Sequence, residues 1–216
     1  NTCSIREKAD EKMYSELGRI NIEKEKLLKN KNKYMIIGVT GCVPETAKLD
    51  IFKRAKYINF ILGPQSYFKF SEFLNKIKNN LYFDQKKKKL IAKETHLAHL
   101  DFTTTEKFDF LAEERQSNTG VSAFISVQEG CDKHCTYCVV PNTRGKQVSR
   151  PYQQIMTEIK QVLENPNIKE IFLLGQNVTA YKDNSTGTTI KLSDLIQKIS
   201  EIDAVKRIRY TTSHPI

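Results

Sequence analysis

The sequence lacks both features that would direct the chain into or across a membrane. No apolar run approaches the about 20 residues that a membrane-spanning helix needs. No charged segment followed by an apolar one stands at the beginning, so no secretory signal is visible. With 39% hydrophobic and 28% charged residues, the composition is that of a globular chain rather than a disordered one. We therefore expect a cytoplasmic protein with no membrane partner.

Cysteine is scarce, and its odd count of five argues against a secreted scaffold held together by disulfides. Such a scaffold needs an even number of cysteines and an oxidising compartment. Three of the five cysteines lie instead inside the stretch GCDKHCTYCVVP at 130–141, where they span eight residues. Thiols clustered in this way are typical of a reducing compartment, where they bind metal or react.

Acidic residues are outnumbered by basic ones, 25 to 35, which gives a net charge of +10. A surplus of this size favours a polyanionic partner, and nucleic acid is the first candidate. The alternative is a lysine-rich surface that reflects composition alone. The run Lys86–Lys89 taken by itself is more typical of a solvated turn than of a binding site.

Apolar runs and helical periods alternate along the chain, which predicts an α/β fold with mostly parallel sheets. In the first part we expect two helices, over roughly 5–19 (capped by Ser4 and Glu7) and from Phe68 to Ile77, and two strands, at 34–39 and 57–62. In the last part we expect strands at 121–127, 168–174 and 205–212 and helices at 152–164 and 191–202. Residues 84–117 are polar and without a clear period, so the sequence predicts two domains, 1–83 and 118–216, joined by a linker.

Polar or metal-binding residues follow each predicted strand of the second domain. The first strand leads into Gly130 and Cys131, the second into GQN at 175–177, and the third into TTSHP at 211–215. Because the carboxyl ends of parallel strands lie at one edge of a sheet, reactive groups of α/β enzymes gather there. The three strand ends are therefore expected to form an active site.

Three thiolates close together leave one coordination position of a metal centre open. Thiolates are soft ligands that select zinc, copper(I) or iron–sulfur clusters. A structural zinc site needs a closed set of four ligands, but His134 lies between two of the cysteines and Cys42 is distant in the sequence. A four-iron cluster held by three cysteines would keep one iron for a small molecule. A zinc site remains the alternative.

The spacing C-x-x-x-C-x-aromatic-C after the first strand, formed by Cys131, Cys135, Tyr137 and Cys138, resembles that of the radical S-adenosylmethionine (SAM) superfamily. The resemblance implies that the three cysteines hold a four-iron, four-sulfur (4Fe-4S) cluster whose open iron binds SAM. It implies reductive cleavage of SAM to a 5′-deoxyadenosyl radical. It also implies that 118–216 form the first half of a partial (β/α)6 barrel.

The longer run GCDKHCTYCVVPNTRGKQVSRP resembles the methylthiotransferases within this superfamily. The matching positions outside the cysteines are Pro141, Arg144, Gly145, Ser149 and Arg150. NTCSIREKA at 1–9 and GCVPE at 41–45 resemble two cysteine motifs of the family's N-terminal domain. They imply that Cys3 and Cys42 hold an auxiliary 4Fe-4S cluster with a third cysteine outside the chain. The alternative is that Cys3 and Cys42 are ordinary buried cysteines.

The resemblance also places a cysteine motif before this chain and an RNA-binding domain after it. The chain begins without Met and ends on TTSHPI. We therefore expect a piece of a longer protein that starts within the N-terminal domain and ends about halfway round the barrel.

Four further residues are candidates for contact with SAM. Gln176 and Asn177 lie where members of the superfamily contact it, although a helix-capping turn is an equal alternative. Tyr137 belongs to the cysteine motif. Arg144, and Arg150 with it, would meet a phosphate or the SAM carboxylate, the alternative being a surface ion pair.

NTCSIREKA, LLGQNVTAY and YTTSHP resemble the branch of the family that methylthiolates C2 of N6-isopentenyladenosine beside the anticodon of tRNA. The implied reaction consumes two SAM molecules, and the implied partners are the tRNA anticodon loop, SAM and a reductant such as flavodoxin or ferredoxin. We expect a monomer. Two alternatives stay open: an enzyme acting on threonylcarbamoyladenosine of tRNA, and a non-catalytic RNA-binding module stabilised by metal.

Overall fold

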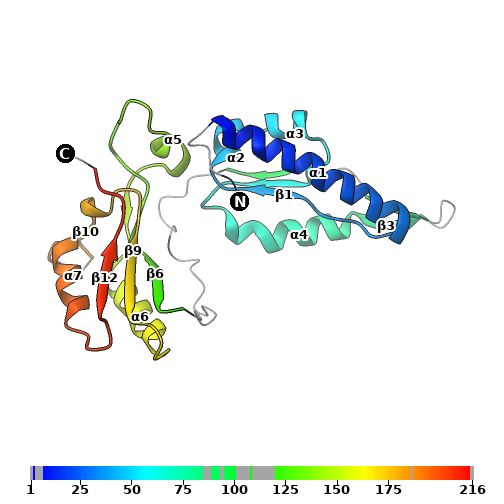
Figure 1. The fold of residues 1–216 in the computed structure, drawn as a ribbon. Helices are drawn as coiled ribbons and strands as arrows, with labels where there is room; N and C mark the ends of the chain where they lie inside the picture. The colour runs from blue at the N-terminus through cyan, green and yellow to red at the C-terminus, as the bar shows by residue number, and fades with distance from the viewer. Residues whose placement is uncertain are drawn as a thin grey trace. The chain divides into compact units, whose positions relative to one another are not determined.

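The computed structural model describes residues 2, 7–84, 89–92, 95–100, 108, 120–185 and 187–214. It consists of two compact units, one formed by residues 1–103 with 136–144 and the other by residues 104–135 with 145–216 (Figure 1). Both units are built from helices around a parallel sheet, as the alternation of apolar patterns predicts. Within the described residues, no helix is both long and apolar enough to cross a membrane.

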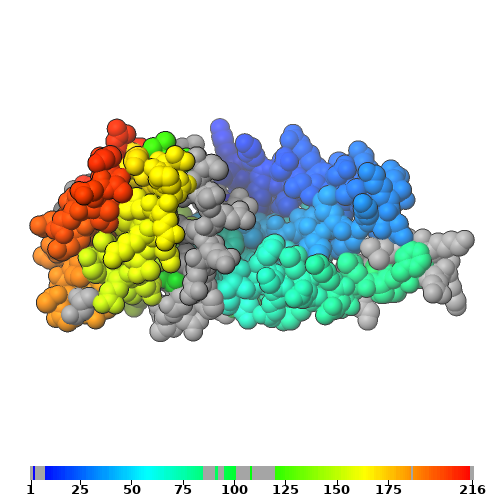
Figure 2. All heavy atoms as spheres, turned by 90° about the horizontal axis from the view of Figure 1, so that it is seen from below, coloured from blue at the N-terminus to red at the C-terminus, as the bar shows by residue number. Residues whose placement is uncertain are grey.

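The sheet of the first unit has the order β1-β2-β5, with all strands parallel. Helices α1 and α4 cover its opposite faces (Figure 1), and α4, coloured teal, is exposed on the face that Figure 2 shows. Ile61 of β2 packs with Leu17 of α1, whereas its neighbours on the strand pack with Phe73 and Ile77 of α4. The elements of this unit are α1 (Glu7–Lys31), β1 (Gly38–Thr40), α2 (Cys42–Ala47), α3 (Asp50–Arg54), β2 (Phe60–Leu62), η1 (Tyr67–Lys69), α4 (Phe70–Asn79), β3 (Leu81–Asp84), β4 (Lys89–Ala92), β5 (Leu97–His99) and α5 (Val140–Arg144).

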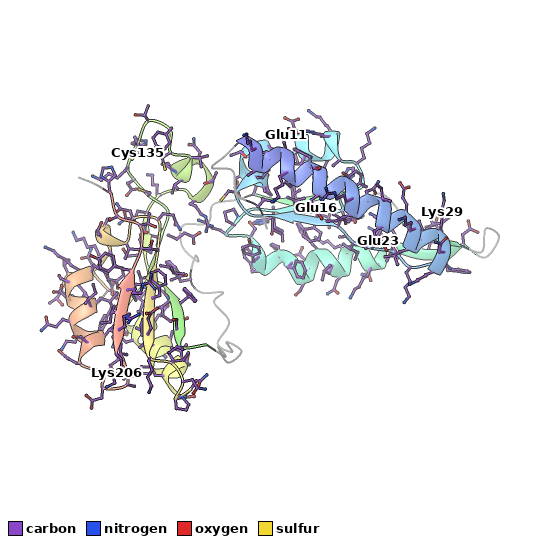
Figure 3. All side chains as sticks on the ribbon, in the orientation of Figure 1. Glu11, Glu16, Glu23, Lys29, Cys135 and Lys206 are labelled. Atoms are coloured by element: carbon purple, nitrogen blue, oxygen red, sulfur yellow. The ribbon has the colours of Figure 1, made fainter. Side chains whose placement is uncertain are left out.

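Helix α1 runs to Lys31, well beyond the predicted end at residue 19. Its second half has few apolar residues, and Glu23 and Lys29 of this half are exposed (Figure 3). A buried lysine anchors this half instead, because Lys24 Nζ donates to the Tyr57 carbonyl at 2.9 Å and to Asn59 Oδ1 at 3.2 Å. Ser4 and the side chain of Glu7, expected to cap the helix, lie outside the described residues.

Two strands lie within the segment 84–117 that the sequence pattern marks as irregular. β4 pairs with β3 in an antiparallel hairpin, and β5 joins the parallel sheet beside β2. β5 has only three residues and lies at the edge of the sheet, so its own sequence carries almost no periodic signal. The expected strands at 34–39 and 57–62 are likewise shorter, beginning at Gly38 and Phe60.

The three-stranded sheet of the second unit is parallel and has the order β6-β9-β12. The order of its strands in space is therefore the same as their order in the sequence. Helix α6 connects β6 to β9, and α7 connects β9 to β12. The predicted strands and helices of this part are confirmed to within a few residues. The elements are β6 (Ser122–Ser126), β7 (Gln128–Glu129), β8 (Val148–Ser149), α6 (Tyr152–Leu163), β9 (Glu170–Leu174), η2 (Val178–Ala180), β10 (Lys182–Asp183), β11 (Ile190–Lys191), α7 (Leu192–Ser200) and β12 (Arg207–Tyr210).

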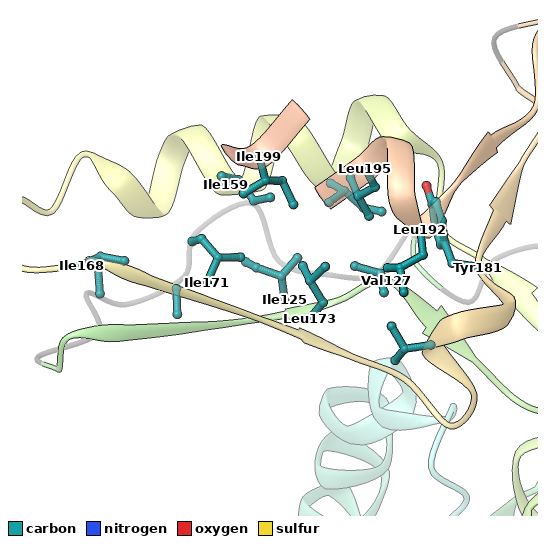
Figure 4. Packing of buried hydrophobic residues seen from close by; sticks show 13 residues of the cluster. Ile125, Val127, Ile159, Ile168, Ile171, Leu173, Tyr181, Leu192, Leu195 and Ile199 are labelled. Carbon is teal, nitrogen blue, oxygen red and sulfur yellow. The ribbon is translucent and has the colours of Figure 1, made fainter. Parts of the chain in front are cut away.

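Alternate residues of the strands form the core of the second unit with the inner faces of α6 and α7. Ile125 and Leu173 point from the sheet toward Ile159, Leu195 and Ile199 of the helices (Figure 4). All five side chains are fully buried. This packing holds the three parallel strands in register and so sets where their carboxyl ends lie.

Asp183 fixes the first turn of α6, which follows the short strand β8. Its Oδ2 accepts the Tyr152 N–H at 2.7 Å and the Ser185 hydroxyl at 2.9 Å, and its Oδ1 accepts the Ser185 N–H at 2.8 Å. Burial alone would raise the pKa of Asp183, but these donors to its carboxylate outweigh burial and hold the pKa below its usual value.

We predict that Asp183→Asn destabilises the protein at pH 7 by about 1–2 kcal/mol, because the charged acceptor is lost. A depressed pKa in the folded state adds stability above the unfolded pKa of about 3.9, and this stability disappears as the pH falls through the folded value. The difference from wild type should therefore shrink in urea unfolding curves as the pH falls below about 4. Asp203→Asn on the exposed surface is the control. Equal losses in both variants at pH 7 would contradict the assignment.

Candidate functional site

Hydrogen bonds join the three loops that follow β6, β9 and β12. After β9, the Val178 N–H donates to the Thr212 carbonyl of the third loop at 2.8 Å. The His214 N–H of that third loop donates to Asn177 Oδ1 at 3.1 Å. The loop after β6 is joined to the loop after β9 through Gln128 and Gly130. The expected meeting of the three strand ends is therefore confirmed.

Gln128 is the residue at the centre of this meeting point, and it was not among the predicted site residues. Its side chain is buried, with 1% of its surface exposed. Its Oε1 accepts the N–H groups of Gln176 at 2.8 Å and Asn177 at 2.9 Å, and its Nε2 donates to the Gly130 carbonyl. The sequence indicates this role of Gln128 only weakly, because its one sign is an amide side chain between a buried strand and Cys131.

Gln176 and Asn177 use their side-chain oxygens inside the protein. Gln176 Oε1 accepts the Gly130 N–H at 2.7 Å. Asn177 is buried, and its Oδ1 accepts the Thr179 hydroxyl at 3.1 Å in addition to the His214 N–H. Asn177 precedes the short helix η2, but its side chain does not cap that helix. The side-chain oxygens of Gln176 and Asn177 accept N–H groups of the two neighbouring loops instead.

The three clustered cysteines lie on the segment between β7 and α5, which contains neither helix nor strand. Cys131 is buried, its N–H donates to the Gly145 carbonyl at 3.2 Å, and its Sγ accepts the Lys133 N–H at 3.4 Å. Cys135 is exposed (Figure 3), and Cys138 is half-buried. None of the three is in a disulfide, so all three thiols are available as ligands.

The donor set of this loop suits an iron–sulfur cluster. Among the residues that the structure describes, no three His, Cys, Asp or Glu side chains are close enough to hold a metal ion. The chemistry nevertheless fits, because three free thiols share one short loop and a backbone N–H already points at the Cys131 sulfur. Hydrogen bonds to ligand sulfurs are typical of protein-bound clusters. Ligand loops commonly take their final form only with the metal bound.

The remaining predicted contacts lie in different environments. The Tyr137 side chain is 96% exposed. Arg144 ends α5, and its carbonyl accepts the Gln65 side-chain amide at 2.9 Å within the first unit. The sequence suggested that Arg150 meets a phosphate or forms an ion pair at the surface. Its guanidinium is instead buried and pairs with the Glu158 carboxylate. The ring of Phe108 lies over the guanidinium, with its centroid 6.0 Å from Arg150 Cζ.

In the first unit, Cys42 follows β1 at the corresponding edge of the other parallel sheet. Cys3 lies outside the described residues, but Thr2 forms a parallel bridge with Gly41. The Thr2 N–H donates to the Thr40 carbonyl at 2.8 Å, and the Cys42 N–H donates to the Thr2 carbonyl at 3.1 Å. The residue before Cys3 thus lies beside the residue before Cys42.

We predict that Gly130→Ala disrupts the loop of Cys131. Gly130 has a φ of +76°, and an added Cβ would lie 2.2 Å from the Lys146 carbonyl oxygen. The unfavourable φ costs about 1–2 kcal/mol, and the overlap with backbone adds about 1–3 kcal/mol. Gly187→Ala is a matched control, because Gly187 has a φ of +81° but no atom within 4 Å of the added Cβ. Urea unfolding should show a larger loss in the free energy of unfolding for Gly130→Ala than for Gly187→Ala. Losses of the same size would contradict the prediction, because the loop would then accommodate the added Cβ without cost.

Two family models match the chain. Residues 1–63, which contain Cys3 and Cys42, match the model described as Uncharacterized protein family UPF0004. Residues 125–216, which contain Cys131, Cys135 and Cys138, match the model described as Radical SAM superfamily. Each cysteine group of the sequence thus falls within one matched region.

Curated relatives match along the whole chain, and their printed name is tRNA-2-methylthio-N(6)-dimethylallyladenosine synthase. The chain is 44% identical over 216 residues to the protein of Pelagibacter ubique, 45% over 217 residues to that of Klebsiella pneumoniae (strain 342), and 47% over 218 residues to that of Orientia tsutsugamushi (strain Boryong). These matches cover 100% of the chain but only 44%, 41% and 45% of the relatives. The chain therefore spans less than half the length of these relatives. The chain thus contains a region that matches the Radical SAM superfamily, and along its whole length it is similar to these methylthio-adding synthases.

Proposed function

We propose that the chain is part of a tRNA methylthiotransferase, which adds a methylthio group to C2 of N6-isopentenyladenosine beside the anticodon. The observation that carries the proposal is the position of three free cysteines directly after the first strand of a parallel sheet. The identity of 44–47% to synthases of this product supports the choice of substrate. A C2 hydrogen of adenine has no easy polar route to replacement by sulfur, so radical chemistry fits the reaction.

The strand order of the second unit supports a partial (β/α)6 barrel over 118–216. In a barrel, each strand is added beside the previous one, whereas the order reverses in a doubly wound sheet. The order β6-β9-β12 shows no reversal. We propose 1–83 as the domain of the auxiliary cluster and 84–117 as the connecting segment, from which β5 returns to the first sheet.

Cys131, Cys135 and Cys138 would hold the SAM-binding 4Fe-4S cluster. When bound, this cluster supplies one-electron reductive cleavage of SAM to a 5′-deoxyadenosyl radical. The turn containing Gln176 and Asn177 would border the SAM molecule. We infer this because the Gly130 N–H, next to Cys131, is bonded to the Gln176 side chain. Tyr137 and Arg144 stay candidates for further contacts with SAM.

Cys3 and Cys42 would hold the auxiliary cluster with a third cysteine from outside the chain. The backbone bonds between Thr2 and Cys42 support this pairing, because they bring the two cysteine motifs side by side. The proposed partners are the tRNA anticodon loop, which the net charge of +10 suits, SAM and a reductant of the flavodoxin or ferredoxin type. A single-stranded loop allows the target base to enter a pocket. A monomer in the cytoplasm completes the proposal.

We predict that Cys135→Ala abolishes formation of 5′-deoxyadenosine from SAM under reducing conditions. After anaerobic reconstitution with iron and sulfide, the wild-type protein should absorb broadly near about 400 nm, and the variant should lose about half of its bound iron. His134→Ala is the control, because His134 shares the exposed loop and is the nearest fourth ligand for zinc. A colourless protein that binds zinc, and loses it in His134→Ala, would support the metal-stabilised RNA-binding module instead.

We predict that disruption of the gene removes the 2-methylthio group from tRNA while isopentenyladenosine remains. Mass spectrometry of nucleosides from digested tRNA measures both species. Loss of the methylthio group from threonylcarbamoyladenosine, with the isopentenyladenosine derivative unchanged, would move the protein to the other tRNA-modifying branch. Unchanged tRNA nucleosides would contradict a tRNA substrate.

A further inference from the structure

The hydrogen bonds of Gln128, Gly130 and Gln176 form a closed ring. Gln128 Nε2 donates to the Gly130 carbonyl, the Gly130 N–H donates to Gln176 Oε1 at 2.7 Å, and the Gln176 N–H donates to Gln128 Oε1 at 2.8 Å. Two side-chain amides thus cross-link the loops after β6 and β9 in opposite directions. Any shift of one loop past the other breaks at least one bond of the ring.

We propose that Gln128 is a positioning residue, which sets the segment beginning at Cys131 against the Gly175–Asn177 turn and thereby determines the affinity for SAM. This inference rests on the proposed function, because it takes the two loops as the sides of the SAM site. Gln128 itself would touch neither the cluster nor SAM. Its action passes through Gly130, the neighbour of Cys131, and through the backbone of Gln176 and Asn177.

Only an amide can make the bonds that Gln128 makes. Its oxygen accepts two backbone N–H groups, and its nitrogen donates to a backbone carbonyl, so the residue needs both a donor and an acceptor. The side chain is 1% exposed, so no water can substitute cheaply for a lost partner. Glutamate has the same shape and keeps the acceptor, but an ionised carboxylate cannot donate to the Gly130 carbonyl.

The space around this amide is as restricted as its bonding. A Cβ added to Gly175 would lie 2.5 Å from Gln128 Oε1 and 2.9 Å from Val178 Cγ2. The backbone of the turn therefore approaches the amide at a distance that only glycine allows. This contact makes the position of the turn depend on where the Gln128 side chain lies.

The test compares Gln128→Glu with Gln161→Glu, the same chemical change on the exposed face of α6. Both proteins are reconstituted anaerobically with iron and sulfide, and SAM affinity, iron per chain and the thermal midpoint are measured. We expect Gln128→Glu to bind SAM at least about tenfold more weakly than Gln161→Glu. Iron per chain should stay close to that of Gln161→Glu, whereas the thermal midpoint should be lower, because the buried carboxylate leaves the Gly130 carbonyl without its donor. If Gln128→Glu does not fold, Gln128→Asn, which keeps the amide but is one methylene shorter, takes its place with the same expectation.

Three outcomes decide the matter. Equal SAM affinity in the two variants, while wild type loads iron and binds SAM, would overturn the positioning role and leave the proposed function intact. A loss of SAM affinity no larger than the loss of bound iron would also overturn it, because Gln128 would then only keep the loop folded. A wild-type protein that takes up no iron would overturn the proposed function, and this inference with it.

Discussion

The parallel arrangement of β6, β9 and β12 is the constraint on which the second unit depends. Because the three strands point the same way and are neighbours in the order β6-β9-β12, their carboxyl ends lie at one edge. Three loops that are distant in the sequence thereby become neighbours in space. The buried isoleucine and leucine side chains between the sheet and α6 and α7 hold this arrangement in place. Hydrogen bonds of Gln128, Gln176 and Asn177 then fix the loops at this edge relative to one another.

The same logic governs the first unit on a smaller scale. β1, β2 and β5 are also parallel, and Cys42 follows the end of β1. The bridge between Thr2 and Gly41 places the start of the described chain at the same edge. A described cysteine thus follows the carboxyl edge of each sheet, Cys42 in the first unit and Cys131 in the second, and each of the two lies in a different family match.

Elements with a strong local pattern could be predicted from the sequence, and elements that depend on distant partners could not. Helices α6 and α7 have apolar residues at helical spacing, so their periods identify them. The second half of α1 is anchored by Lys24, whose partner Asn59 is distant in the sequence. The short strand β5 forms through its pairing with β2, which its own sequence does not reveal. The cysteine spacing is local and can therefore be recognised in the sequence. The role of Gln128 could not be predicted, because its partners Gln176 and Asn177 lie on a loop that is distant in the sequence.

The buried pair of Arg150 and Glu158 joins the residue that follows β8 to the middle of α6. Both side chains are less than one-tenth exposed, so each charge relies on the other for compensation. Removing one partner of such a pair costs about 3–5 kcal/mol, whereas apolar replacement of both together is often neutral. The two positions are therefore coupled in folding stability: both can be exchanged together at little cost, whereas replacing either one alone destabilises the folded chain.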